Sequence, residues 1–124
     1  MRIFKTKLFA RFARRERIAD ASLREAVDRI ARGLVDADLG GGLIKQRIAR
    51  AGQGRSGGYR VLLAFREKDR TVFVYGFAKS DRENIDDQEL AVVREVSDSW
   101  LGANAEMIGR ALAEGLLIEV QNDN

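Results

Sequence analysis

Two alternating segments joined by a short polar turn constrain the fold more than any other feature of the sequence. YRVLLAFR (59–66) places Tyr59, Val61, Leu63 and Phe65 on one face and Arg60, Leu62, Ala64 and Arg66 on the other. TVFVYGFAK (71–79) alternates similarly, with Val72, Val74 and Ala78 opposite Phe73, Tyr75, Phe77 and Lys79. The intervening REKDR turn is too short for a crossover, so the two strands are predicted to form an antiparallel hairpin.

A third strand is predicted over LIKQRIA (43–49), with Ile44 and Ile48 on one face and Lys45 and Arg47 on the other. The preceding chain is predicted to form two helices. MRIFKTK is interpreted as a short basic lead, followed by a helix over 8–17. Phe4, Leu8 and Phe12 recur at four-residue spacing and mark its apolar side, with Phe9 adjacent to it. We expect this helix to pack into the core; the alternative is a basic helix lying on a membrane surface.

The second helix has the clearest pattern. Ser22 and Glu25 match a capping box, and Gly33 fits a C-terminal cap. One apolar stripe then follows helical spacing: Leu23, Ala26, Val27, Ile30, Ala31 and Leu34. Two helices joined so closely are expected to form a hairpin.

The C-terminal part is predicted to be helical. Asp86 and Glu89 resemble a capping box at the start of a helix over 87–101, with Leu90, Val93, Val96 and Trp100 on its buried side and Gly102 at its end. Asn104 is expected to cap a last helix that runs through Ala113 and stops at Gly115. LLIEV (116–120) is either a small edge strand or an irregular tail.

These elements predict one α+β domain over residues 1–124. It would contain an N-terminal helical hairpin, an antiparallel sheet of three to four strands and C-terminal helices. No apolar run approaches the length of a membrane span, and the N-terminus lacks the features of a signal peptide, so we expect a cytoplasmic protein without a membrane partner.

The absence of histidine and cysteine excludes several kinds of chemistry. The usual zinc and iron sites and the Ser-His and Cys-His nucleophile systems cannot be built. We expect neither a metal nor a cofactor. An enzyme with this composition would have to use lysine, arginine, tyrosine, serine or carboxylate side chains.

Gly52, Gly54 and Gly57 spell the G-x-G-x-x-G pattern of dinucleotide-binding loops. That pattern needs a preceding strand and a following helix N-terminus, whereas these glycines precede a strand, so we reject nicotinamide binding. Two interpretations remain. The loop is a plain connection, or it is a basic flap in which Arg50 and Arg55 bind a ligand.

Charge is distributed unevenly. Residues 1–79 contain 19 Lys+Arg and 8 Asp+Glu, a net of +11, while residues 80–124 contain 3 and 11, a net of −8. No acidic residue occurs from 39 to 66, and local neutralisation is therefore not expected there. Alternation brings four cations to one sheet surface, which favours a polyanion as partner: Lys45, Arg47, Arg60 and Lys79.

The stretches GLIKQRIARAGQGRSGGYRVLLAF and VFVYGFAKSDRENI, followed by an acid-capped helix, resemble the RelE/ParE superfamily of bacterial type II toxins, in particular its RelE/HigB branch. The resemblance covers residues 1 to about 101. It implies a twisted antiparallel sheet with two N-terminal helices on one side and a C-terminal helix. It also implies binding at the ribosomal A site, cleavage of mRNA there, and a cognate antitoxin that often binds DNA.

The resemblance maps family basic positions onto Lys45, Arg47, Arg60, Lys79 and Arg82. We expect attack of an RNA 2′-hydroxyl on the adjacent phosphate without a metal. Arg60 would bind that phosphate, Lys45 would act as general base because neighbouring cations favour its neutral form, and Lys79 or Arg82 would assist the leaving oxygen. The proton acceptor remains open, because the sequence has no histidine and no tyrosine after Tyr75.

Further residues are expected to bind RNA: Arg50, Arg55 and Arg82 through its backbone, and Tyr75 or Phe77 by stacking on a base. Structural roles are the alternatives. Lys45 and Arg47 would then only solvate a surface, Arg60 would pair with an acid such as Glu95, and Lys79 and Arg82 would serve the turn near Asp86.

Two other functions stay open at this point. The protein could be a non-catalytic inhibitor, such as a ParE-like poison of DNA gyrase, or a plain nucleic-acid-binding module. The convergence of cations from three strands favours the endoribonuclease.

Overall fold

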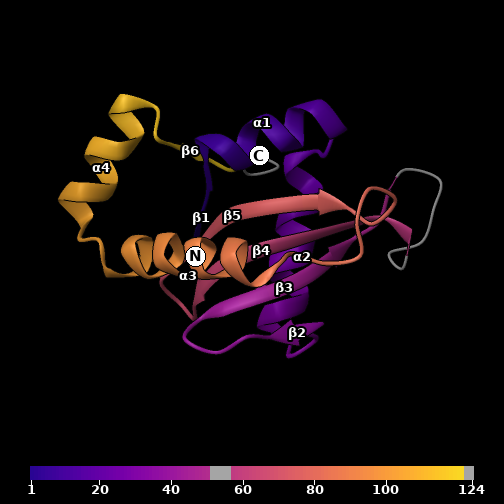
Figure 1. Ribbon diagram of the computed structural model, residues 1–124. Coiled ribbons are helices and arrows are strands. Elements are labelled where there is room, and N and C mark those ends of the chain that lie inside the picture. The colour runs from indigo at the N-terminus through magenta and orange to yellow at the C-terminus, as the bar shows by residue number, and fades with distance from the viewer. Residues whose placement is uncertain (51–56, 122–124) are drawn as a thin grey trace.

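The computed structural model describes residues 1–50 and 57–121, and it is an α+β protein as predicted (Figure 1). Its described part contains four helices and six strands. In chain order they are β1 (Arg2–Thr6), α1 (Lys7–Glu16), α2 (Asp20–Ala31), β2 (Ala37–Asp38), β3 (Leu43–Ile48), β4 (Tyr59–Arg66), β5 (Arg70–Ala78), α3 (Asp87–Gly102), α4 (Ala105–Glu114) and β6 (Leu117–Glu119).

The strands form one mixed sheet in the order β2-β3-β4-β5-β1-β6. The antiparallel β3-β4-β5 centre agrees with the prediction, but the expectation of three to four antiparallel strands was wrong. The MRIFKTK lead is not a loop: it forms β1, which pairs in parallel with β5, and β6 adds to its far side. A five-residue strand next to a helix is too short to show its own period, and burial of Phe4, 1% exposed, anchors it instead.

The helices α1 and α2 cover one face of the sheet, which is the face turned away from α3 in Figure 1. Phe9 and Phe12 of α1 are buried there together with the apolar stripe of α2, so the expected core-packing role of α1 is confirmed. Its predicted apolar side was wrong at two positions, because Phe4 belongs to β1 and Leu8 is 59% exposed.

The prediction for α2 was wrong at the start of the helix and is confirmed at its end. The N-terminal cap is Ala19, without a side-chain hydrogen bond, so the capping box at Ser22 was wrong. The C-terminal end matches the prediction: Gly33 has a φ of +85°, and its amide donates to the Ile30 carbonyl. The stripe also ends one turn early, since Leu34 is 57% exposed.

The helices α3 and α4 cover the other face. The Asp86–Glu89 capping box at the start of α3 is present as predicted, as is the Asn104 cap of α4. After Gly115 ends α4, the chain enters β6, which settles the open choice for LLIEV in favour of an edge strand. The sheet therefore lies between two helical layers with an apolar core on each side.

A bulge between β4 and β5 breaks the predicted alternation of β5. Leu62 pairs with Tyr75, but Leu63 pairs with Phe73, so Val74 is the extra residue. Phe73 faces the α1–α2 layer, whereas Tyr75 and Phe77 face the α3–α4 layer. The predicted common face of Phe73, Tyr75, Phe77 and Lys79 was therefore wrong, because a bulge reverses the alternation of every residue beyond it.

Gly76 lies just beyond this bulge and leaves room for Phe12. A Cβ at Gly76 would lie 2.5 Å from Cε2 of the buried Phe12 ring. We expect Gly76→Ala to lower the free energy of unfolding by about 1–3 kcal/mol, because the ring has to shift within a filled core. Urea unfolding monitored by circular dichroism measures this change.

Gly109 provides the control. It lies inside α4, and nothing approaches a Cβ built there within 4 Å. Gly109→Ala should therefore raise stability by up to about 1 kcal/mol through helix propensity. Equal unfolding midpoints for Gly76→Ala and the wild-type protein would show that the Phe12 contact does not constrain this position.

Candidate nucleic-acid interface

The strands β3 and β4 bring three cations to the α3 side of the sheet, and a fourth directly follows β5. We call these four the cationic sheet face: Lys45, Arg47, Arg60 and Lys79. Arg47 of β3 lies directly opposite Arg60 of β4, and Arg60 lies opposite Phe77 of β5. Lys45 is two residues before Arg47 in β3, so alternation places the two on the same face. Lys79 directly follows Ala78, the last residue of β5.

Directly opposed arginines repel each other across a strand pair. Asp36 offsets this repulsion: its carboxylate accepts from Nε and Nη2 of Arg47 at 3.1 and 2.8 Å and from the Arg47 amide at 2.8 Å. Partial burial opposes ionisation of Asp36, but the hydrogen bonds from Arg47 outweigh it and hold the pKa of Asp36 below its ordinary value. Arg47 is therefore oriented by a carboxylate outside the acid-free stretch.

Arg50 points away from the cationic sheet face. It donates from Nε to the Tyr59 hydroxyl at 3.0 Å and from Nη2 to Glu16 at 3.1 Å, which links β4 to the end of α1. Its guanidinium also lies over the Tyr59 ring. The expectation that cations between 39 and 66 lack carboxylate partners was wrong for both Arg47 and Arg50, because the acids come from distant parts of the chain. Arg55 lies outside the described residues.

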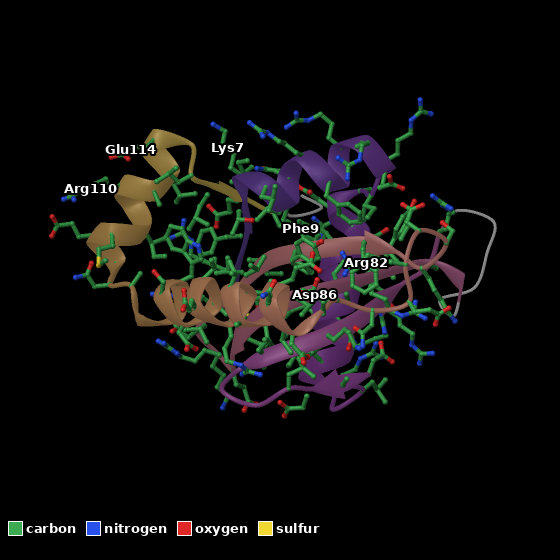
Figure 2. The ribbon with its side chains drawn as sticks, viewed as in Figure 1. Lys7, Phe9, Arg82, Asp86, Arg110 and Glu114 are labelled. Carbon is green, nitrogen blue, oxygen red and sulfur yellow. The ribbon has the colours of Figure 1, made fainter. Side chains whose placement is uncertain are left out.

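Arg82 is held by the first turn of α3. It forms two hydrogen bonds with the Glu89 carboxylate, at 2.6 and 3.0 Å, and Nη1 lies 3.4 Å from the Tyr75 hydroxyl. Tyr75 itself donates to Glu89 at 3.0 Å. Arg82 therefore stabilises the turn that leads into α3, which is the structural role given as its alternative. Figure 2 shows Arg82 and Asp86 where the chain passes from β5 into α3.

Hydrogen bonds from Arg82, above all, lower the pKa of Glu89 from 4.5 to about 2. Burial and the neighbouring Glu89 raise the pKa of Tyr75, so its phenol stays protonated at neutral pH. Tyr75 is half-buried, and Phe77 is only 4% exposed with Arg82 over its ring. Glu89 thus joins Arg82 and Tyr75 into one cluster beside the cationic sheet face.

Asn84 connects this cluster to β3. Its Oδ1 accepts from Nζ of Lys45 at 3.3 Å, while its backbone carbonyl accepts from Arg82 at 2.9 Å. Within the described residues, no carboxylate pairs with Lys45 or Lys79. Asn84, Asp36 and Glu89 were not predicted as site residues. Glu89 was read only as a helix cap, and no sequence signal marks a contact between positions as far apart as 45 and 84.

The site consists of cationic side chains, the carboxylates of Asp36 and Glu89 that bind two of them, the amide of Asn84 and the half-buried Tyr75. Among the described residues, no group of histidine, cysteine or acidic side chains could hold a metal ion. No described helix has the length and apolarity needed to cross a bilayer. The cationic sheet face can bind successive phosphates of a polyanion and stabilise negative charge that develops on one of them.

The fold and this surface define a small α+β protein with a cationic sheet face suited to a phosphate chain. A family model described as the RelE toxin of the RelE/RelB toxin-antitoxin system matches residues 1–120. The chain therefore belongs to the RelE toxin family and is the toxin of a toxin–antitoxin system, with a cognate antitoxin as its partner. No protein with a curated description matches it.

The depressed pKa of Glu89 predicts a pH-dependent contribution to stability. Below about pH 2 the carboxyl is protonated in both folded and unfolded chains and contributes nothing, whereas above about 4.5 it is ionised in both and the full contribution is present. Wild-type protein should therefore be more stable than Glu89→Gln near neutral pH, with the difference shrinking as pH falls from about 4.5 to about 2.

Chemical denaturation at a series of pH values measures this difference. Glu95→Gln is the matched control, since Glu95 is an exposed carboxylate of the same helix. It should give a much smaller pH-dependent difference. A gap between wild type and Glu89→Gln that does not change across this range would mean that the Arg82 pair does not depend on the Glu89 charge.

Proposed function

We propose that this toxin is a metal-independent, ribosome-dependent mRNA endonuclease that inhibits translation in the cytoplasm. The observation that carries the proposal is the cationic sheet face, where Arg47 and Arg60 lie directly opposite each other and Lys45 is on the same face of β3 as Arg47. Family membership supports it, because toxins of this family are generally ribonucleases. The alternative of a gyrase poison has no observation in its favour beyond the superfamily resemblance.

The proposed reaction needs only groups that this chain contains. The RNA 2′-oxygen attacks the adjacent phosphorus, the bond to the 5′-oxygen breaks, and the products are a 2′,3′-cyclic phosphate and a 5′-hydroxyl. Arg60, with Arg47 beside it, stabilises the charge that develops on the phosphate. Positioning of the RNA strand by the remaining cations supplies the orientation that the displacement requires.

Two lysines are assigned to proton transfer. Lys45 takes the 2′-hydroxyl proton, and its hydrogen bond to Asn84 positions the amine. Lys79 gives a proton to the leaving 5′-oxygen. Arg82 is assigned to binding a flanking phosphate and not to the leaving oxygen, because its two hydrogen bonds to Glu89 hold it at the start of α3.

Arg55 and Tyr75 are assigned supporting roles. Arg55 lies within the glycine-rich connection between β3 and β4 in the sequence and would contact the RNA backbone. Arg50 is assigned no RNA contact, because it points away from the cationic sheet face and bonds to Tyr59 and Glu16. The half-buried Tyr75 would stack on a base, with its hydroxyl held by Glu89. Charge-assisted contacts to phosphates carry no sequence information, so they fit any codon held in place by the ribosome.

Replacement of Arg60 tests the proposal. Arg60→Ala should lower mRNA cleavage by on the order of 10²–10³, because one donor to the developing phosphate charge is lost. Cleavage is measured in a purified translation system by primer extension, and the 3′ end is analysed for a cyclic or linear phosphate. Arg110→Ala, an exposed arginine of α4 away from the sheet, is the control and should cleave like wild type.

Two results would contradict the proposal. Full cleavage by Arg60→Ala, with unchanged folding by circular dichroism, would place the reaction elsewhere on the molecule. Intact mRNA in the wild-type reaction together with trapped gyrase–DNA complexes would assign the toxin to the gyrase poisons.

A further inference from the structure

Arg29 is a buried arginine that the proposed reaction does not use. It belongs to α2, which packs behind β3 (Figure 1), and it is only 4% exposed among the apolar side chains of that helix. Taking a guanidinium out of water is costly unless its donors find partners. An aliphatic side chain would fill the position without that cost, so the contacts that Arg29 makes indicate its role.

The donors of Arg29 reach three groups. Nε donates to both carboxylate oxygens of Glu25, one turn earlier in α2, at 3.0 Å. Nη2 donates to the backbone carbonyl of Arg47 at 2.6 Å, and Nη1 lies 3.5 Å from Oδ2 of Asp36. Two of these contacts lead to Arg47, one directly and one through the carboxylate that binds its side chain.

The backbone of Arg47 is held on the edge of β3 that faces β2. The register of β2 against β3 stops at Lys45, so Arg47 lies just beyond it. There Asp36 accepts from the Arg47 amide and Arg29 donates to the Arg47 carbonyl, as a neighbouring strand would. Because both backbone groups point to that edge, Arg47 and Arg60 form the closely spaced, non-hydrogen-bonded kind of antiparallel pair.

The contact with Asp36 also determines which donors of Arg47 are available. Oδ1 of Asp36 occupies Nε and Nη2, which form the inner edge of the guanidinium. Among the described residues, none accepts from Nη1, and the Arg47 side chain is 45% exposed. The outer N–H groups of Nη1 and Nη2 form a fork that matches two oxygens of a phosphate.

We propose that Arg29 is a positioning residue, which fixes the backbone of Arg47 and the carboxylate of Asp36 so that the outer nitrogens of Arg47 hold the phosphate that is cleaved. This inference rests on the proposed function, in which Arg47 and Arg60 stabilise charge on that phosphate. Donors that are fixed before RNA binds do not have to be reordered during the reaction. Since Arg29 is buried, it acts only through Arg47 and Asp36.

A double-mutant cycle of Arg29 and Arg47 tests the proposal. Arg29→Met removes the charge but keeps an unbranched side chain that can fill the buried position. Single-turnover mRNA cleavage in the purified translation system should fall by about 10–100-fold, because Arg47 is no longer held in place. In an Arg47→Ala background the same substitution should cause almost no further loss, since no guanidinium is left to position.

Arg32→Met is the matched control. Arg32 is exposed at the end of the same helix and contacts only the Asp28 carbonyl among the described residues, so this variant should cleave like wild type. Equal losses from Arg29→Met in both backgrounds would show a purely structural role and overturn the proposal, as would normal cleavage by Arg29→Met. If circular dichroism shows that Arg29→Met does not fold, Arg29→Lys, which keeps the charge but not the fork, enters the same cycle with the same criteria.

Nuclear magnetic resonance separates this inference from the proposed function. The Nε–H group of Arg47, bonded to Asp36 at 3.1 Å, gives a signal that Arg47→Lys identifies by removing it. Arg29→Met should shift or broaden this signal, and Arg32→Met should leave it in place. An unchanged signal in Arg29→Met would overturn the inference even if wild type cleaves mRNA. Wild-type protein that cleaves no mRNA would overturn the proposed function, and the Arg47 signal would still decide whether Arg29 positions Arg47.

Discussion

The bulge between β4 and β5 is the constraint on which the arrangement of the molecule depends. It inserts Val74 between Phe73 and Tyr75, so Phe73 reaches the core under α1 and α2, while Tyr75 and Phe77 lie on the α3 side. Without the bulge, one of the two apolar cores would lose an aromatic residue.

Distant carboxylates make that face compatible with a stable sheet. Asp36 orients Arg47, and Glu89 orients Arg82 while it also caps α3. Each of these pairs is partly exposed, which keeps the net stabilisation modest and leaves the guanidinium accessible to a competing phosphate. Carboxylates that hold arginines in place before RNA arrives reduce the cost of ordering those side chains on binding.

Much of the central sheet could be predicted because the alternation of residues between its two faces depends only on positions close in the sequence. Alternation in 43–48 and 59–66 places Ile44 and Arg60 on the faces that they occupy, and the caps at Asp86 and Asn104 are where the side-chain chemistry places them. β1 was missed because five residues beside a helix carry too little pattern. The ion pairs were missed because Asp36–Arg47 and Arg50–Glu16 join elements whose packing no local pattern encodes.

The sequence by itself determined the α+β class, the hairpin of β4 and β5, the caps that start α3 and α4 and the excess of positive charge, since each of these depends on composition or on neighbours close in sequence. Tertiary structure alone decided the parallel pairing of β1, the bulge at Val74 and the carboxylates that Arg47 and Arg50 meet. The reason is physical: periodicity and capping are energies of adjacent residues, whereas register and ion pairing depend on which surfaces are buried against each other.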